Sequence, residues 1–294
     1  MNAILFPGQG SQFVGMAKDH FDSSNDVKKL FLSADEQLGY AITEIMFEGP
    51  SETLMQTRYT QPAIFLHSVA LFYEMNIIPD AVAGHSLGEL SALVAAKVLS
   101  FETALDLVQL RGDLMQEAGE IHPGTMAAII GMDDAVVDDI CAEASEEINK
   151  PVVAANYNCP GQLVISGDED AVSKAVDIAK ERGCRLAKML PVSGAFHSPL
   201  MKPALDGFKK KVDNIEFNDP VCPFYSNATA EPTRKSDVVK ENLIAQLTSP
   251  VRWTQTLLNM ESNGITDFTE VGPGKVLQGL VKRTVSNANI TGHQ

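Results

Sequence analysis

Short apolar runs alternate with longer stretches of helical periodicity through the first 123 residues. The runs at 3–8 and 80–85 end in turn residues, and each predicts a short buried strand. Apolar side chains that recur at helical spacing predict helices over 62–77, 87–100 and 100–119. Strands that alternate with helices are typical of an α/β fold, so we expect that class here.

The residues at the ends of two of these helices predict where they begin and stop. Pro62 suits the first position of its helix, because its fixed φ fits there and its missing N–H would have no partner. Ser100 is expected to cap the helix that follows it, and Gly119 to close that helix.

A different pattern occupies residues 124–193 and predicts a separate small domain. Strand, helix, strand, strand, helix and strand follow one another there, at 124–132, 133–147, 151–158, 162–167, 168–183 and 184–192. This order is the split βαβ unit of ferredoxin-like folds. We therefore expect a ferredoxin-like domain at 124–193, inserted into a larger domain made of 1–123 and 194–294.

The chain beyond residue 193 returns to the first pattern and completes the larger domain. It predicts helices at 198–215, 237–247 and 251–263, and strands at 221–227 and 265–271. Clefts between domains are favoured ligand sites, so we expect the site where the two domains meet.

The composition is that of a soluble globular protein, with 45% hydrophobic and 21% charged residues. No run of about 18 apolar residues predicts a membrane span, and the N-terminus lacks the basic start of a signal peptide. The four cysteines have no C-x-x-C spacing, which argues against a zinc site and fits reduced thiols. We expect a cytoplasmic protein without a metal.

The formal net charge of −15 opposes nonspecific binding of nucleic acid, which needs clustered Lys and Arg. An acidic surface of this kind commonly serves only to keep a protein soluble. An anionic ligand would therefore require positive charge gathered locally at its site.

The segment AVAGHSLGEL, residues 81–90, carries the clearest candidate chemistry. It places Ser86 in a G-x-S-x-G motif between a predicted strand and a predicted helix, which is the pattern of a nucleophile elbow. Gly84 and Gly88 allow the tight turn, and the N–H of Leu87 could stabilise an oxyanion. The alternative is a structural Gly/Ser loop.

A serine nucleophile needs a base, and histidine is the usual one. Of six histidines, His197 is favoured because it lies in a Gly- and Ser-containing loop where the chain re-enters the larger domain. A histidine that merely caps the next helix is the alternative. The others are placed less well: His20 and His67 in helices, His85 pointing away from the turn, His122 at a loop and His293 at a terminus expected to fray.

The loop FPGQGSQ, residues 6–12, is expected to supply a second oxyanion donor, because it follows a strand and has free N–H groups. A phosphate site is the alternative for such a loop. The Lys of a P-loop is missing, and the segment does not match G-x-G-x-x-G because residue 13 is Phe. Both features argue against a phosphate site.

Seven motifs, taken in order, resemble the malonyl-CoA:acyl carrier protein transacylases and the acyltransferase domains of fatty-acid and polyketide synthases. The resemblance extends from residue 5 to about 283. It implies an α/β-hydrolase-like core with a ferredoxin-like insert, in agreement with the pattern described above. The motifs are FPGQGSQFVGM, TQPAIF, GHSLGELSALVAA, RGDLMQ, GTMAAIIG, GAFHSPLM and VGPGKVLQGLV.

The resemblance implies a role for each residue that matches. Ser86 would be the nucleophile that carries the acyl ester, and His197 its general base. The main-chain carbonyl of Gln246 would orient that base. The N–H groups of Gln9 and Leu87 would form the oxyanion hole.

Two further matches concern the acyl group. Arg111 matches an arginine that holds the free carboxylate of malonyl, which a guanidinium can take with two parallel hydrogen bonds. Without the resemblance, a surface arginine would be the first interpretation. Phe196 matches a position that is aromatic where malonyl is used, and its ring would fill the space of an α-methyl group. Simple core filler is the alternative for Phe196.

The resemblance thus implies transfer of malonyl from malonyl-CoA to the phosphopantetheine thiol of acyl carrier protein, in fatty-acid synthesis. We expect no cofactor, no nucleic-acid or membrane partner, and a monomer. The alternatives are a serine hydrolase or acyl-thioesterase, the same transferase loading a polyketide synthase, and an inactive carrier-binding protein. Because CoA and the carrier are anionic, we expect a basic patch that binds them. The candidates are Lys188, Lys202 and Lys209–Lys211. A solvated helix face is the alternative for these lysines.

Overall fold

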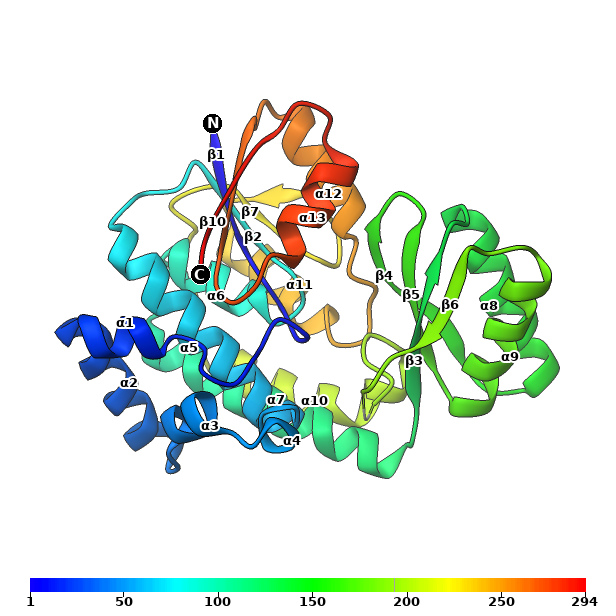
Figure 1. Cartoon of the computed structure of the whole chain (residues 1–294), viewed down its shortest axis with the longest axis horizontal. Helices are drawn as coiled ribbons and strands as arrows, with labels where there is room; N and C mark the ends of the chain where they lie inside the picture. Colours follow the sequence, from blue (N-terminus) through cyan, green and yellow to red (C-terminus); the bar gives the residue numbers. More distant parts are fainter. Residues whose placement is uncertain (193) are drawn as a thin grey trace.

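Two β-sheets, each with its own helices, organise the chain (Figure 1). The computed structural model describes residues 1–192 and 194–294. The larger sheet has six strands in the order β10-β9-β1-β2-β7-β8, and the smaller has four in the order β4-β5-β3-β6. The predicted α/β class is confirmed. The predicted edge of the small domain at residue 193 lies outside the described residues.

The inner strands of the larger sheet are buried on both faces. Its described strands run parallel except for β8, which is antiparallel to β7. Side chains alternate along β1, so that Ala3 and Leu5 enter one hydrophobic cluster while Ile4 and Phe6 enter another. The strands are β1 (Asn2–Phe6), β2 (Ala81–Gly84), β7 (Phe224–Tyr225), β8 (Pro232–Thr233), β9 (Asp267–Val271) and β10 (Asn289–His293).

Helices supply the apolar side chains on either side of this sheet. The face with Ile4 and Phe6 packs against a large cluster that includes α5 (Thr57–Met75), α6 (Gly88–Ala95) and α7 (Phe101–Ile121). The opposite face packs against α12 (Trp253–Ser262) and α13 (Val276–Thr284). The remaining helices of this part are α1 (Lys18–Ser23), α2 (Asn25–Leu38), α3 (Ile42–Glu48), α4 (Ser51–Leu54), η1 (Pro199–Met201), α10 (Lys202–Asp213) and α11 (Ser236–Ala245).

The smaller sheet is antiparallel, and the two helices of this part pack on one face. Aliphatic side chains of α8 (Asp134–Ile148) and α9 (Glu169–Glu181) form its separate core. Met126 and Val164 face the other way, toward the cluster of the larger part. The strands are β3 (Thr125–Ile130), β4 (Val152–Cys159), β5 (Gln162–Gly167) and β6 (Leu186–Met189), and pairs β4–β5, β5–β3 and β3–β6 are all antiparallel.

The order of strands in the larger sheet brings three loops to one edge. β1, β2 and β7 are parallel neighbours, with Phe6 opposite Gly84. Because the carboxyl ends of parallel strands meet at the same edge of a sheet, the residues that follow them lie together. Gln9, Ser86 and Asn227 are therefore brought to one place from distant parts of the sequence.

The prediction that Pro62 begins a helix is wrong. α5 begins at Thr57, so Pro62 lies inside it. Proline has no N–H to donate to the carbonyl of Arg58, one turn earlier. The hydroxyl of Tyr40 donates to that carbonyl instead, at 3.5 Å, which satisfies the group that the ring leaves free.

The predicted ends of the next two helices are also wrong. α6 stops at Ala95, because Lys97 takes a left-handed φ of 58° and the N–H of Val98 donates back to Leu93 at 2.9 Å. This is a C-terminal stop made without glycine, so the sequence hides it. α7, in contrast, runs past Gly119 to Ile121, while its predicted cap is confirmed: Ser100 accepts from the N–H of Thr103.

Two predictions at the end of the chain need correction. The strand expected at 221–227 pairs only over Phe224–Tyr225. His293, expected in a frayed terminus, lies in β10 opposite Val271 of β9, and its carbonyl accepts from the N–H of Gly272 at 3.0 Å. Parallel pairing with an inner strand therefore anchors this segment. No helix in the described part of the chain is long and apolar enough to cross a membrane.

Candidate active site

Close backbone contacts fix the turn that carries Ser86. Ser86 has φ 51°, in the left-handed region that serine rarely occupies. A Cβ on Gly84 would lie 1.9 Å from the backbone of Gly88, and one on Gly88 would lie 2.1 Å from the oxygen of Phe6. The side chain of Asn227 spans the turn, accepting from the N–H of Ser86 at 2.6 Å and donating to the carbonyl of Gly84 at 2.7 Å.

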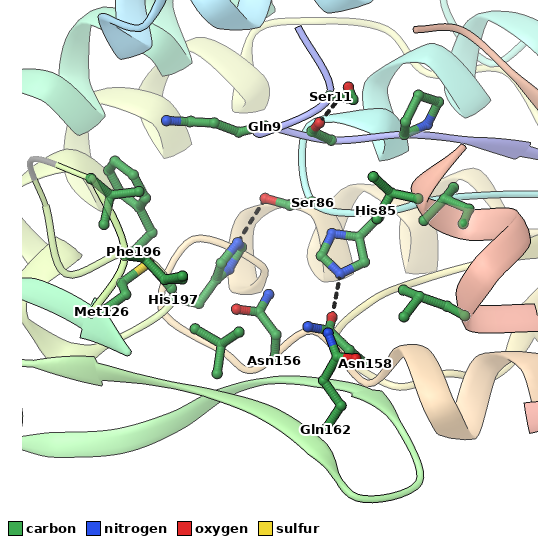
Figure 2. Close-up of a pocket in the computed structure, with 18 of the residues that line it drawn as sticks. Gln9, Ser11, His85, Ser86, Met126, Asn156, Asn158, Gln162, Phe196 and His197 are labelled. Carbon is green, nitrogen blue, oxygen red and sulfur yellow. Dashed lines mark hydrogen bonds between the residues drawn. The ribbon is translucent and has the colours of Figure 1, made fainter. Parts of the chain in front are cut away.

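Ser86 and His197 are hydrogen-bonded, with 2.7 Å between Oγ and Nε2 (Figure 2). The Nδ1 of His197 lies 2.9 Å from the main-chain oxygen of Gln246. A carbonyl oxygen can only accept, so Nδ1 carries a proton. In the neutral ring Nε2 is then the acceptor for the Ser86 hydroxyl. The structure thus brings together the three residues that the sequence suggested as nucleophile, base and orienting carbonyl.

The surroundings of His197 keep its ring neutral. Burial is the main cause and the Arg111 charge the next, and together they lower the pKa of His197 to about 3. The hydrogen bond to the Gln246 carbonyl acts in the opposite direction but is weaker. A neutral imidazole is the form that can accept a proton from serine.

Arg111 is fully buried beside Ser86, so the interpretation as a surface residue is wrong. Its Nη1 donates to Gln61 Oε1 at 2.8 Å, and its Nη2 donates to Gln246 Oε1 at 2.8 Å and to Ser86 Oγ at 3.1 Å. Burial lowers the pKa of Arg111 to about 10, which leaves the guanidinium charged at neutral pH. Each of these three acceptors is neutral.

A second buried ionisable group, Glu89, lies behind Gln246. It accepts hydrogen bonds from the Gln246 side chain, the N–H of Asn227 and the hydroxyl of Ser226. Burial raises the pKa of Glu89 to about 7, while these hydrogen bonds and Arg111 act in the opposite direction. The site therefore holds a cation and a carboxyl group linked through one amide side chain.

A cavity of about 200 Å³ opens beside Ser86 and His197. Figure 2 shows Gln9 and Ser86 on the side of the larger sheet, and Asn156, Asn158 and Gln162 of the smaller part opposite them. Phe196 also lines the cavity and is buried. Arg111 is not among the lining residues. Its Nη2 donates to Ser86 Oγ, and Ser86 does line the cavity.

His85, the neighbour of Ser86, lines the same cavity, and its ring is directed toward Asn158 (Figure 2). Its Nε2 lies 2.9 Å from Asn158 Oδ1, and the ring packs edge-on against Trp253. His85 thus joins the smaller sheet to the elbow without contacting the Ser86 hydroxyl through its ring.

The backbone N–H groups of Gln9 and Leu87 have no hydrogen-bond acceptor among the described residues. Leu87 is buried at the start of α6, and Gln9 follows β1 in the loop that faces the turn. The side-chain Nε2 of Gln9 donates a long hydrogen bond, 3.4 Å, to the hydroxyl of Thr57.

Sequence reasoning missed several residues of this site. Gln61, Glu89 and Asn227 hold Arg111 and the turn, and the amides of Asn156 and Asn158 face the cavity. A signal existed for Glu89, since a lone acid in the apolar segment LGELSALVAA seldom lies buried without a purpose. Across the described residues, no group of three or more His, Cys, Asp or Glu is placed to hold a metal.

Comparison with known proteins agrees with this fold. The acyl transferase domain family matches residues 4–293. The chain therefore belongs to the acyl transferase family, as the motif resemblance predicts. Its similarity to individual members is high along nearly the whole chain.

A relative from Bacillus subtilis (strain 168), named malonyl CoA-acyl carrier protein transacylase, is 46% identical over 284 residues, 96% of this chain and 89% of the relative. The structure of an acyl carrier protein S-malonyltransferase from Vibrio cholerae is 43% identical, with a TM-score of 0.95, and covers 100% of this chain and 96% of its own. A malonyl-transacylase solved in complex with its type II PKS acyl-carrier protein is 40% identical, with a TM-score of 0.93 and coverage of 99% and 94%.

Proposed function

We propose that the protein transfers a malonyl group from malonyl-CoA to the phosphopantetheine thiol of an acyl carrier protein, in fatty-acid synthesis. The observation that carries the proposal is the meeting of the Ser86 hydroxyl, a neutral His197 and a charged Arg111 within hydrogen-bond distance. The names of relatives that are 40 to 46% identical over nearly the whole chain support the same activity.

The first half-reaction acylates Ser86. His197 Nε2 takes the hydroxyl proton while Oγ attacks the thioester carbonyl of malonyl-CoA. The N–H groups of Gln9 and Leu87 are the proposed donors to the oxyanion. When the tetrahedral intermediate collapses, the proton on His197 goes to the departing thiolate of CoA.

The second half-reaction runs the same steps with a new thiol. The phosphopantetheine thiol of the carrier protein gives its proton to His197 and attacks the seryl ester. The Ser86 oxygen leaves and recovers the proton, so that the hydroxyl is restored. The Gln246 carbonyl, bound to Nδ1, supports the ring when it is positively charged in both half-reactions.

Arg111 is proposed to select the acyl group. In the free protein its Nη2 donates to Ser86 Oγ, and an acyl group on that oxygen would bring the malonyl carboxylate close to the guanidinium. The malonyl carboxylate would give Arg111 a negatively charged acceptor, whereas its present acceptors are all neutral. Phe196, which lines the cavity beside His197, is proposed to exclude an α-methyl group.

The amides opposite Ser86 suit the pantetheine arm of both thioesters. Asn156, Asn158 and Gln162 offer hydrogen-bond donors and acceptors along one wall, and pantetheine contains two amide groups that need both. CoA is thus a substrate here, and the proposed reaction uses no cofactor.

The proposal also includes the types of the two domains, the cellular location and the oligomeric state. The strand–helix order at 124–192 and the four-stranded antiparallel sheet with helices on one face support a ferredoxin-like domain at 124–193. The parallel sheet with a nucleophile turn supports an α/β-hydrolase-like domain made of 1–123 and 194–294. We propose a cytoplasmic monomer that binds no nucleic acid.

The basic patch proposed for carrier docking is partly offset by acids. Lys209 pairs with Asp213 at 2.6 Å and Lys211 lies 3.8 Å from Asp106. Neutralising Lys209–Lys211 should lower both carrier-protein affinity and its dependence on salt. If titration of the triple variant with carrier protein gives the wild-type affinity and salt slope, the patch lies elsewhere.

Brief exposure to malonyl-CoA or acetyl-CoA, followed by mass spectrometry, tests the central proposal. Wild-type protein should gain a malonyl group on Ser86 far faster than an acetyl group, and Arg111→Ala should lose that preference. Equal labelling by the two thioesters would contradict the role of Arg111. Continued release of CoA beyond one equivalent per protein, in the absence of a carrier protein, would instead indicate the hydrolase.

A further inference from the structure

The Glu89 carboxyl group takes no part in the proton transfers above, yet only one side chain separates it from Arg111. Its Oε2 accepts from Gln246 Nε2 at 2.6 Å and from the N–H of Asn227 at 3.2 Å. Its Oε1 accepts from the Ser226 hydroxyl at 3.2 Å. Glu89 and Gln246 are both fully buried, so water does not replace these partners.

These contacts fix which end of the Gln246 amide faces Arg111. The Nε2 of Gln246 donates to two acceptors, Glu89 Oε2 and the main-chain oxygen of Ser86 at 2.9 Å. The Oε1 is thereby turned to the Arg111 guanidinium, at 2.8 Å. A flipped amide would set its NH₂ group against the donors of Arg111 and its oxygen against two acceptors, which leaves buried groups unpaired.

The same arrangement keeps the Arg111 charge available. Glu89 offsets the buried positive charge through the Gln246 amide, without a direct ion pair. A carboxylate bound directly to the guanidinium would compete with the carboxylate of the substrate.

We infer that Glu89 is a positioning residue for acyl-group selectivity: by fixing the Gln246 amide, it holds Arg111 in the orientation that meets the malonyl carboxylate. The inference rests on the proposed function, because it takes a carboxylated acyl group as the substrate.

The test is the ratio of Ser86 acylation rates with malonyl-CoA and acetyl-CoA, followed by mass spectrometry in variants of the full chain. Glu89→Met removes the acceptors and should lower the ratio about tenfold. Glu89→Gln should keep it within about twofold, because its carbonyl can accept from Gln246 and Asn227 while its NH₂ faces the Ser226 hydroxyl. A general loss of structure would not move this ratio selectively.

Two further variants separate selectivity from folding. Glu270 is also buried, but it accepts from the N–H groups of Leu277 and Gln278 at the start of α13. Glu270→Met should lower the melting temperature and leave the ratio unchanged. If Glu89→Met does not fold, Gln246→Met replaces it, since this change removes the amide but keeps the carbonyl that holds His197. It should lower the ratio as Glu89→Met would.

A wild-type ratio in Glu89→Met, or in Gln246→Met where that variant replaces it, would overturn the inference. So would a ratio in Glu89→Gln as low as in Glu89→Met, because hydrogen-bond geometry would then not be the cause. Failure of the proposed function looks different, since wild-type protein itself would accept the two thioesters equally.

Discussion

The two sheets differ in where they place their polar and charged groups. Around the carboxyl ends of β1, β2 and β7, buried groups include Glu89, Arg111, His197 and Gln246. The core between the smaller sheet and its helices is instead aliphatic, and its ion pairs lie outside, as with Lys150 and Asp168. Burying charge costs stability unless partners are supplied, so the concentration of such groups here supports the proposed active site.

The smaller part contributes a wall rather than reactive groups. Asn156 and Asn158 face the cavity from the sheet face that α8 and α9 leave open. Its amides can bind without changing protonation, whereas the larger part holds His197 and Glu89 near Ser86, and burial shifts the pKa values of both. The predictions below test this division of labour.

The largest effect is expected from the groups that react. Ser86→Ala should abolish acylation by malonyl-CoA, and His197→Ala should slow it by about 10³-fold or more, since a neutral base is lost. Mass spectrometry of the intact protein measures both. His122→Ala, at the exposed end of α7, is the matched control and should acylate at the wild-type rate.

A smaller but still large effect is expected from the turn that carries Ser86. Gly88→Ala places a Cβ 2.1 Å from the oxygen of Phe6, so the variant should lose about 3 kcal/mol or more of unfolding free energy and most acylation. Gly279→Ala is the control, because a Cβ there meets nothing within 4 Å. This variant should be slightly more stable than wild type, since alanine favours a helix more than glycine does. Denaturant unfolding decides, and equal stabilities would contradict the close contact.

The pH dependence of acylation should reflect the lowered pKa of His197. A base works when it is neutral. With a pKa of about 3, His197 stays neutral, and the protein stays active, at pH values well below 6.5, the ordinary pKa of histidine. In Arg111→Ala the second-largest cause of the lowering is removed, so the acid limb should move to higher pH. Acetyl-CoA acylation rates against pH measure this in both proteins.

Titration of Glu89 must be distinguished from titration of His197 in the pH profile of acylation. Glu89→Gln has no carboxyl group to titrate, so an acid limb that remains in this variant belongs to the base. A wild-type limb near pH 7 that disappears in Glu89→Gln would assign the titration to Glu89 instead.

The smallest effect is expected on the surface of the smaller part. Lys150→Ala breaks the exposed pairs with Asp168 and Asp170, which water and salt already screen. Acylation should be unchanged and the melting temperature should hardly move. A marked loss of acylation would show that the smaller part does more than form a wall.

Much of this organisation could be predicted from local sequence signals. The strand and helix order at 124–192 follows the periodicity, and Ser100 caps α7 as expected. Helix ends were less predictable, because α5 accommodates Pro62 and α6 stops at a left-handed Lys97. For α2, no helix was predicted, although Ser24 caps it and Gly39 ends it in the left-handed region.

The sequence by itself determined the α/β class and the serine turn, and it suggested the proposed reacting groups, because glycine spacing and motif order can be read along the chain. Only the tertiary structure decided that Arg111 is buried, that Gln246 joins it to Glu89, and that His85 lines the cavity. These depend on which strand ends become neighbours, and a linear pattern does not specify contacts between residues more than a hundred positions apart. Burial then sets the pKa values, since water is excluded only after the sheets and helices have packed.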